Sequence, residues 1–388
     1  MIKKMFFAAM MAVVGLGSTS CSSDNNDTPS EDWSSDAANV DYVAANADSW
    51  GNYMQIVASL LKTDAATLYA DWSSSYNGGD SYATIFKNAK APYTSAKSCV
   101  EQVIDGCYDI ANEVGTAKIG EPYDYYQAGQ YEQALYAVES WYSWHSRDDY
   151  RNNIYSIRNA YYGSLNGKVA TQSISALIAS ANSALDAEVK AAIEAAAVAI
   201  YAIPDPFRNH IGSSEAAEAM DACATLANVL TNKLKPAITA LDENNDDELT
   251  AIVDQYVDVV VLPTYKSLKE ATETLYNKVE TFRKNPSDAN FSAAAQAWLD
   301  AREPWETSEA FLFGPVADKG LDPNMDSWPL DQAGIVQILK SGNYSDLDWN
   351  GDYDEENDKI AAAQGLRGFH TLEFLLFKDG EPRTVSAE

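Results

Sequence analysis

The stretch GFHTLEFLLF, residues 368–377, places a histidine and a carboxylate in a strongly apolar run. His370 and Glu373 are three residues apart, so they share one side of a helix. A buried carboxylate without a partner is costly or takes up a proton. The two side chains therefore need partners, either a metal ion or a hydrogen-bond network. The simpler alternative is a core histidine that bonds its neighbouring glutamate.

A second acidic pattern occurs in AWLDAREPWETSEAFLFGPVADKG, residues 297–320. Arg302, Glu306 and Glu309 follow one another at i, i+4 and i+7, which is one face of a helix. The helix is expected to end at Gly314 and Pro315. We predict a surface ion pair between Arg302 and Glu306. Glu309 is expected to be partly buried, because apolar residues follow it at once.

A third stretch, ESWYSWHSRDDYRNNIYSIRNAYYGS (139–164), mixes polar and aromatic residues. Such a segment packs between elements or lines a cleft with polar groups. Four side chains fall on one helical side, and with Ser143 they are candidates to face the same site: His145, Ser146, Asp149 and Asn153.

The acidic loop DLDWNGDYDEEN, residues 346–357, partly matches the calcium-binding loop of an EF-hand. Its Gly351 stands at the sharp turn, but Asn357 stands where the EF-hand has a bidentate glutamate. The simpler interpretation is a plain acidic loop. If calcium binds here, we expect the site to be weak. The candidate ligands are Asp346, Asp348, Asn350 and Asp352.

Nearly every long segment has apolar residues at three- and four-residue spacing, which predicts helices. Residues 173–203 and 355–377 are each predicted as one helix, and the β-branched run VDVVVL (257–262) as buried helix. No hairpin signal of the Asn-Gly type is identified. Long helices with short breaks predict an all-α fold of two four-helix bundles packed side by side. The polar stretch DENNDDE (242–248) is the expected linker between them.

Residues 1–20 have the positive, apolar and small-residue regions of a signal peptide. Cys21 follows at the position where bacterial lipoproteins are lipidated, and residues 21–36 are polar and aperiodic, which predicts a disordered tether. The acidic residues behind Cys21 resemble surface-export signals of Bacteroides-type lipoproteins. We therefore expect an outer-membrane lipoprotein that is exposed on the cell surface. The alternative is a plain secretory signal with an unmodified Cys21.

The chain is strongly acidic. Its 388 residues include 27 basic and 57 acidic side chains, for a formal net charge of -30. Such a chain repels nucleic acids and anionic membrane surfaces and attracts cations. Beyond Cys21, only Cys99, Cys107 and Cys223 remain, with no CxxC pattern. An odd count of this kind predicts small buried thiols rather than a disulfide framework.

Together, AREPWETSEAFLFGP, WPLD (328–331) and GFHTLEFLLF resemble the successive signatures of the imelysin-like family. Its GxHxxE motif corresponds to Gly368, His370 and Glu373. The resemblance extends to SWHSRDDYRNNIYSIRNAYYG and covers most of the chain. It implies two helical bundles with a site between them, and a link to bacterial iron acquisition.

The order of these signatures is reversed relative to typical members, as in a circular permutant with residues 242–248 bridging the old termini. The resemblance therefore implies one bundle built from both ends of the chain, residues 37–80 and 246–388, which carries GxHxxE. The second bundle is expected to be continuous, over residues 81–241.

The resemblance implies a lipoprotein of iron uptake that binds iron, an iron complex or a partner where the bundles meet. His370, Glu373 and Glu309 are the expected iron ligands, and an outer-membrane uptake component is the expected partner. One alternative is a metallopeptidase that uses HxxE. The chain has only three histidines and no HExxH motif, so the zinc-peptidase pattern is missing. Another is a structural protein in which the His370–Glu373 pair joins the bundles.

Overall fold

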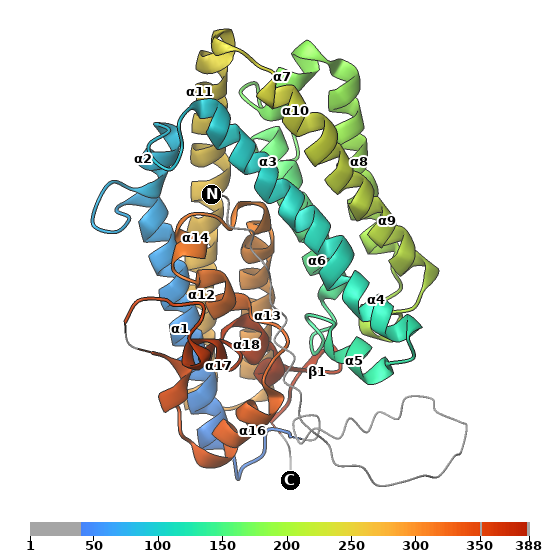
Figure 1. The fold of residues 1–388 in the computed structure, drawn as a ribbon. Helices are drawn as coiled ribbons and strands as arrows, with labels where there is room; N and C mark the ends of the chain where they lie inside the picture. The colour runs from blue at the N-terminus through green and yellow to red at the C-terminus, as the bar shows by residue number, and fades with distance from the viewer. Residues whose placement is uncertain (1–39, 350, 386–388) are drawn as a thin grey trace.

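The computed structural model describes residues 40–349 and 351–385, and its core is built almost entirely from helices (Figure 1). The prediction of an all-α fold is confirmed. Residues 1–39 fall outside the described part, so the predictions for the signal peptide, Cys21 and the whole tether concern residues that the structure does not describe. Within the described part, no helix is long and apolar enough to cross a membrane.

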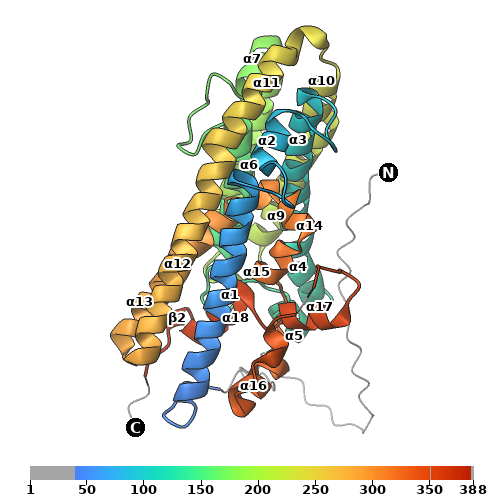
Figure 2. The ribbon, with the colours of Figure 1, turned by 90° about the vertical axis from the view of Figure 1, so that its left-hand side faces the viewer.

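The first bundle combines helices from both ends of the chain, as the blue and red-orange ribbons in Figures 1 and 2 show. Helix α12 packs against α1 and α13, and α18 packs against α1 and α13. The four helices are α1 (Ala47–Ser73), α12 (Leu262–Lys284), α13 (Asp288–Glu306) and α18 (Gly368–Leu376). Large apolar side chains such as Trp50, Leu268 and Trp298 are fully buried between them.

The second bundle is formed by the middle of the chain. Helix α8 packs against α6 and α9, and α3 packs against the same two helices. Its members are α3 (Ala96–Glu113), α6 (Ser146–Tyr162), α8 (Ser183–Ala202) and α9 (Ser214–Val229). Serine side chains cap the first turns of α3 and α9 by accepting a backbone N–H, which satisfies donors that the helix cannot pair internally.

One long helical run joins the bundles. Helix α11 (Asp246–Gln255) packs against α3, continues through a π-helical turn (Tyr256–Val261) and leads directly into α12. The predicted helix at VDVVVL is therefore confirmed. The stretch 242–248 is mostly exposed. Its residues 242–245 belong to the connection between α10 and α11, and residues 246–248 begin α11. Contacts of α6 with α13, and of α3 with a 3-10 turn at Glu309–Phe311, place the functional candidates between the bundles.

The remaining elements are short and connect or cover the bundles. The helices are α2 (Tyr82–Lys87), α4 (Gly120–Gln127), α5 (Tyr131–Tyr136), α7 (Ile174–Ala181), α10 (Lys235–Thr239), α14 (Pro315–Asp318), α15 (Leu321–Asp326), α16 (Gln332–Ser341) and α17 (Asp358–Gln364). Two further π-helical turns lie at Val114–Lys118 and Leu230–Leu234.

Two segments that were predicted as single helices are broken. Residues 173–203 divide at Asn182, whose side chain accepts the N–H of Leu185 and so begins α8. Residues 355–377 divide between α17 and α18, because Arg367 is extended and Gly368 has a φ of 85°. Asparagine and glycine can each start a new helix in this way, so the apolar periodicity alone was misleading.

A small antiparallel hairpin, which the sequence analysis missed, follows α18. Strand β1 (Phe377–Lys378) pairs with β2 (Glu381–Pro382) across Asp379 and Gly380, both of which have positive φ. Asp-Gly with two positive φ values is the sequence pattern of a tight two-residue hairpin turn. The three cysteines of the described chain are free and buried, as predicted.

Candidate cation site between the bundles

Helix α18 delivers His370 and Glu373 to the contact between the bundles, and both are essentially buried. The helix begins at Gly368, where a Cβ atom would lie 2.4 Å from the backbone oxygen of Met325. Glycine is thus required both by the positive φ and by the close approach of the chain that carries Asp326.

Both oxygens of Glu373 are engaged. Oε1 accepts hydrogen bonds from the backbone N–H groups of Tyr142 and Ser143, at 2.9 and 2.8 Å, and from the Ser143 hydroxyl at 2.7 Å. Oε2 lies 3.1 Å from Nδ1 of His370. Glu373 therefore ties the segment before α6, in the second bundle, to α18 in the first.

His370 lies between two carboxylates. Its Nδ1 faces Glu373 and its Nε2 lies 3.1 Å from Oδ1 of Asp326. Burial lowers the pKa of His370, but Asp326 and the hydrogen bond to Glu373 outweigh it and raise this pKa to about 9. At neutral pH the imidazole is therefore protonated on both nitrogens, with Nδ1 donating to Glu373 and Nε2 in an ion pair with Asp326.

Arg302 is fully buried and contacts three carboxylates. Its Nη2 lies 2.6 Å from Glu306, its Nε lies 3.2 Å from Asp149, and its Nη1 bonds Asp326. The predicted surface pair of Arg302 and Glu306 is therefore wrong, since neither side chain is exposed. The spacing identified the pair, but the face of α13 that carries it packs on α6 rather than facing solvent.

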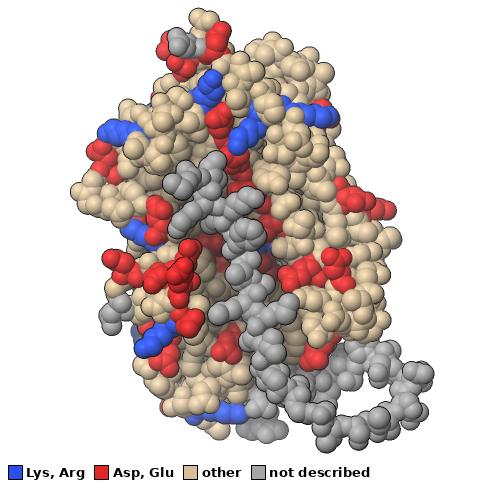
Figure 3. All heavy atoms as spheres, viewed as in Figure 1, with Lys and Arg blue, Asp and Glu red and all other residues tan. Residues whose placement is uncertain are grey.

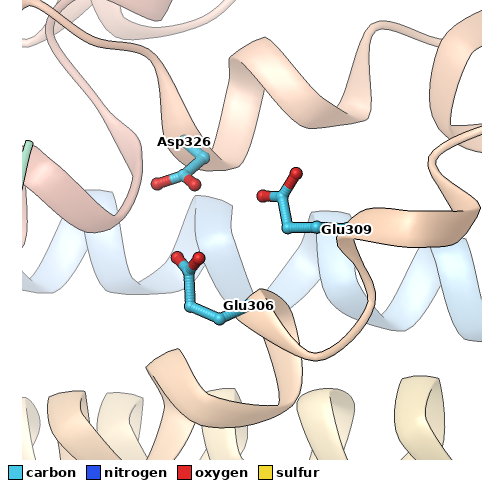
Figure 4. Close-up of side chains that lie close together, drawn as sticks. All are labelled: Glu306, Glu309 and Asp326. Atoms are coloured by element: carbon cyan, nitrogen blue, oxygen red, sulfur yellow. The ribbon is translucent and has the colours of Figure 1, made fainter. Parts of the chain in front are cut away.

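Three carboxylates converge at this point, as Figure 4 shows. Ligand oxygens of Glu306, Glu309 and Asp326 lie within 4.8 Å of one another. Glu306 also accepts a bond from the amide of Asn153, and Asp326 accepts one from the indole of Trp305 at 2.6 Å. Among residues 40–349 and 351–385, the Glu309 carboxylate has no hydrogen bond or ion pair, although it is buried.

The three carboxylates differ in protonation. Burial raises the pKa of Glu306 to about 8, even though Arg302 lowers it. Burial also raises the pKa of Glu309 well above its ordinary value, against the opposing charge of Lys118. Burial also tends to raise the pKa of Asp326, but the positive charges of Arg302 and His370 outweigh burial and hold this pKa below its ordinary value. Burial therefore favours the protonated forms of Glu306 and Glu309, whereas Arg302 and His370 favour the ionised form of Asp326.

Helix α6 contributes two of its candidate residues directly. Asp149 pairs with Arg302 and accepts a bond from Ser140, and Asn153 bonds Glu306. Within the described chain, His145 and Ser146 contact groups other than Glu306, Glu309 and Asp326. His145 lies 3.7 Å from Asp148 and 3.9 Å from Asp149, and Ser146 donates to the backbone oxygen of Glu139.

The structure brings together a different metal-ligand set from the one predicted. The predicted iron ligands were His370, Glu373 and Glu309. In the described chain, both nitrogens of His370 and both oxygens of Glu373 are already engaged with protein groups. Glu309 instead converges with Glu306 and Asp326. The sequence analysis missed Asp326, although it lies two residues before the WPLD signature.

The predicted calcium loop is mostly exposed. Asp348 lies 3.5 Å from Arg367, while Asp346 and Asp352 are exposed at the surface. Asn350 lies outside the described residues. Among those that are described, these aspartates do not form a group of ligand atoms within 4.8 Å.

Two packed helical bundles with a buried acidic cluster at their contact define the class of protein. The family model for imelysin matches residues 24–235 and 261–387, and the chain belongs to the imelysin family. The two matched blocks lie on either side of the stretch that contains the linker.

The chain is similar to a crystal structure of an imelysin peptidase from Bacteroides ovatus. The two share 62% sequence identity and a TM-score of 0.88, over 90% of this chain and 100% of that one. It is also 36% identical over 134 residues to iron-regulated protein A from Synechococcus elongatus. That match covers 33% of this chain and 31% of the relative, so the chain spans about a third of that relative's length.

Proposed function

We propose that this protein is a lipoprotein of bacterial iron uptake that binds iron, free or in a complex, at Glu306, Glu309 and Asp326. One observation carries the proposal: three buried carboxylates converge, and Glu309 has no hydrogen bond or ion pair within the described chain. An isolated buried carboxylate is costly. A cation that it shares with two other carboxylates would offset that cost.

The chemistry of these donors suits a hard cation. All three ligands offer carboxylate oxygen, which small, highly charged cations prefer over sulfur or imidazole donors. The surface charge helps such a cation to approach, since acidic side chains outnumber basic ones on the face shown in Figure 3. Iron is favoured among such cations because a relative is an iron-regulated protein.

The neighbouring side chains would control how the cation is held. Arg302 and His370 keep Asp326 ionised and oriented. Glu306 and Glu309 would exchange their protons for the cation, so binding should release protons and weaken as the pH falls. His370 and Glu373 act in this arrangement as supports of the cluster rather than as ligands.

The binding site is tested by titrating the purified protein with ferric iron in a weak chelating buffer. Glu309→Gln should weaken iron binding by at least about tenfold, because a neutral amide replaces the carboxylate with little change of shape. Glu303→Gln is the matched control, since Glu303 is exposed on α13, the helix just before Glu309. Undiminished iron binding by Glu309→Gln would exclude this site.

The cellular location belongs to the same proposal. Lipidation of Cys21 would anchor the protein in the outer membrane, exposed at the cell surface, beside an uptake component as partner. Cys21→Ser should then release the protein from the membrane fraction. Retention of the variant there would contradict the anchor.

A peptidase remains a second candidate because the Bacteroides ovatus relative is described as an imelysin peptidase. The arrangement of His370 favours the binding function instead. A general base must have a free lone pair, whereas Nδ1 of His370 bonds Glu373 and its Nε2 forms an ion pair with Asp326. Hydrolysis of a generic protein substrate that disappears in His370→Ala would favour the peptidase.

A further inference from the structure

A second site candidate is a cavity lined by residues from α2, α3 and α14 and from the loops that precede these helices. Figure 1 shows where the three helices lie. It is a half-open cavity of about 360 Å³, in the size range of small-ligand pockets. Four of its ten lining residues are aromatic and one is a carboxylate: Tyr76, Tyr82, Tyr93, Phe313 and Asp318.

The ring of Tyr82 stands at nearly right angles to the rings of Tyr76 and Tyr93. Tyr82 meets Tyr76 at a ring distance of 5.4 Å and an angle of 87°, and meets Tyr93 at 6.5 Å and 78°. Their hydroxyl groups are fixed, because those of Tyr82 and Tyr93 bond each other at 2.8 Å and that of Tyr76 donates to Asp318. The ring faces are therefore held in place before any ligand arrives.

The charge at this cavity is negative. Lys319 lies nearby, but both oxygens of Asp71 hold its ammonium at 2.6 and 2.8 Å. The Asp318 side chain, at the cavity edge, is exposed to solvent. Burial raises the pKa of Tyr82 to about 12, so this ring is a neutral phenol with an electron-rich face.

We infer that this cavity binds a small organic ammonium ion, such as an alkylated amine, with Tyr76, Tyr82 and Tyr93 around the cation and Asp318 as its counter-charge. Perpendicular aromatic faces around one carboxylate are the arrangement that recognises such cations. This site is separate from the iron site and does not depend on it.

The test compares two probes of equal shape. The full protein is titrated with choline and with its uncharged tert-butyl analogue, dimethylbutanol, and binding is followed by calorimetry. Choline should bind saturably, and at least about tenfold more tightly than the analogue, because only choline gains the cation–π and charge terms. Equal binding of the two, or no saturable choline binding in the millimolar range, would overturn the inference.

Two pairs of variants assign the binding to this cavity. Tyr76→Leu and Asp318→Asn should each weaken choline binding by about 3- to 30-fold. Their controls, Tyr131→Leu and Asp221→Asn, change exposed residues on α5 and α9 and should have no effect. Glu309→Gln should also bind choline normally, so failure of the iron site and of this site can be told apart. Unchanged choline affinity in both Tyr76→Leu and Asp318→Asn would place the binding elsewhere.

Discussion

At the scale of single residues, the buried cluster is held by a chain of charge-assisted hydrogen bonds. Ser143 and the backbone bond Glu373, Glu373 faces His370, and His370 faces Asp326. Each charged group has an opposite charge or several donors beside it, which is the condition under which burial is tolerated. Removing one member leaves its partner without a compensating charge or hydrogen bond. Neutral and truncating substitutions should therefore lower the free energy of unfolding by different amounts.

Glu373 provides the first prediction. Glu373→Ala leaves two backbone N–H groups and a hydroxyl without their acceptor and should lower the free energy of unfolding by about 3–5 kcal/mol. Glu373→Gln keeps an acceptor oxygen and should lose only about 1–3 kcal/mol. Urea unfolding measures both, with exposed Glu381→Gln as the control. Equal losses in the two Glu373 variants would show that the carboxylate is not the acceptor that matters.

The raised pKa of His370 predicts a pH dependence of stability. The pKa is about 9 in the folded protein against an ordinary 6.5, so the stabilisation is complete below pH 6.5 and is lost as the pH rises through about 9. The raised pKa of Glu306 acts in the same direction between pH 4.5 and about 8. The His370 contribution is at most about 3 kcal/mol.

Urea unfolding of the chelator-treated protein across this range is the measurement. His370→Gln should show a shallower fall of unfolding free energy with pH than the wild type, whereas His210→Gln should follow the wild type. A His370→Gln profile with the slope of the wild type would assign the dependence to other groups.

At the scale of elements, the helix periodicity predicted most helices but not where they break. The run 355–377 is apolar enough for one helix, yet Gly368 turns it so that α18 starts beside Asp326. The candidate residues His370, Glu373, Glu309 and Asp149 could be named from local patterns. Their partners could not, since Tyr142 and Asp326 approach only through tertiary packing.

A substitution at Gly368 tests whether this glycine sets the start of α18. Gly368→Ala combines a left-handed backbone with a Cβ atom 2.4 Å from the Met325 backbone oxygen, and should cost about 2–4 kcal/mol in unfolding free energy. Gly78→Ala is the control, because Gly78 also has positive φ but has open space around it. It should cost only about 1 kcal/mol. Equal costs would mean that the close approach to Met325 is not structurally important.

At the scale of the whole molecule, the two ends of the described chain meet in one bundle. Arg383 donates to the backbone oxygen of Val40 at 3.2 Å and pairs with Asp41. The reversed order of the family signatures was visible in the sequence because each signature is local. The contact between the chain ends was an inference from that order, since no pattern of residues encodes it directly.

Because the two chain ends meet, we predict that a chain with the signature order of typical family members can also fold. A permutant that joins the C-terminus to Val40 through a short Gly-Ser linker, and opens the chain between Asn244 and Asn245, should fold and bind iron. Its new ends lie in the exposed connection between α10 and α11, so no packed helix is interrupted.

The control permutant opens α12 between Lys269 and Glu270, in a helix that packs on both α1 and α13. It should unfold at much lower urea concentration, because the break removes backbone hydrogen bonds and separates apolar residues that must pack as one face. Circular dichroism with urea, followed by iron titration, measures both proteins. Equal instability of the two permutants would contradict this prediction. The connection between α10 and α11 would then be a structural part of the fold and not a replaceable bridge between former chain ends.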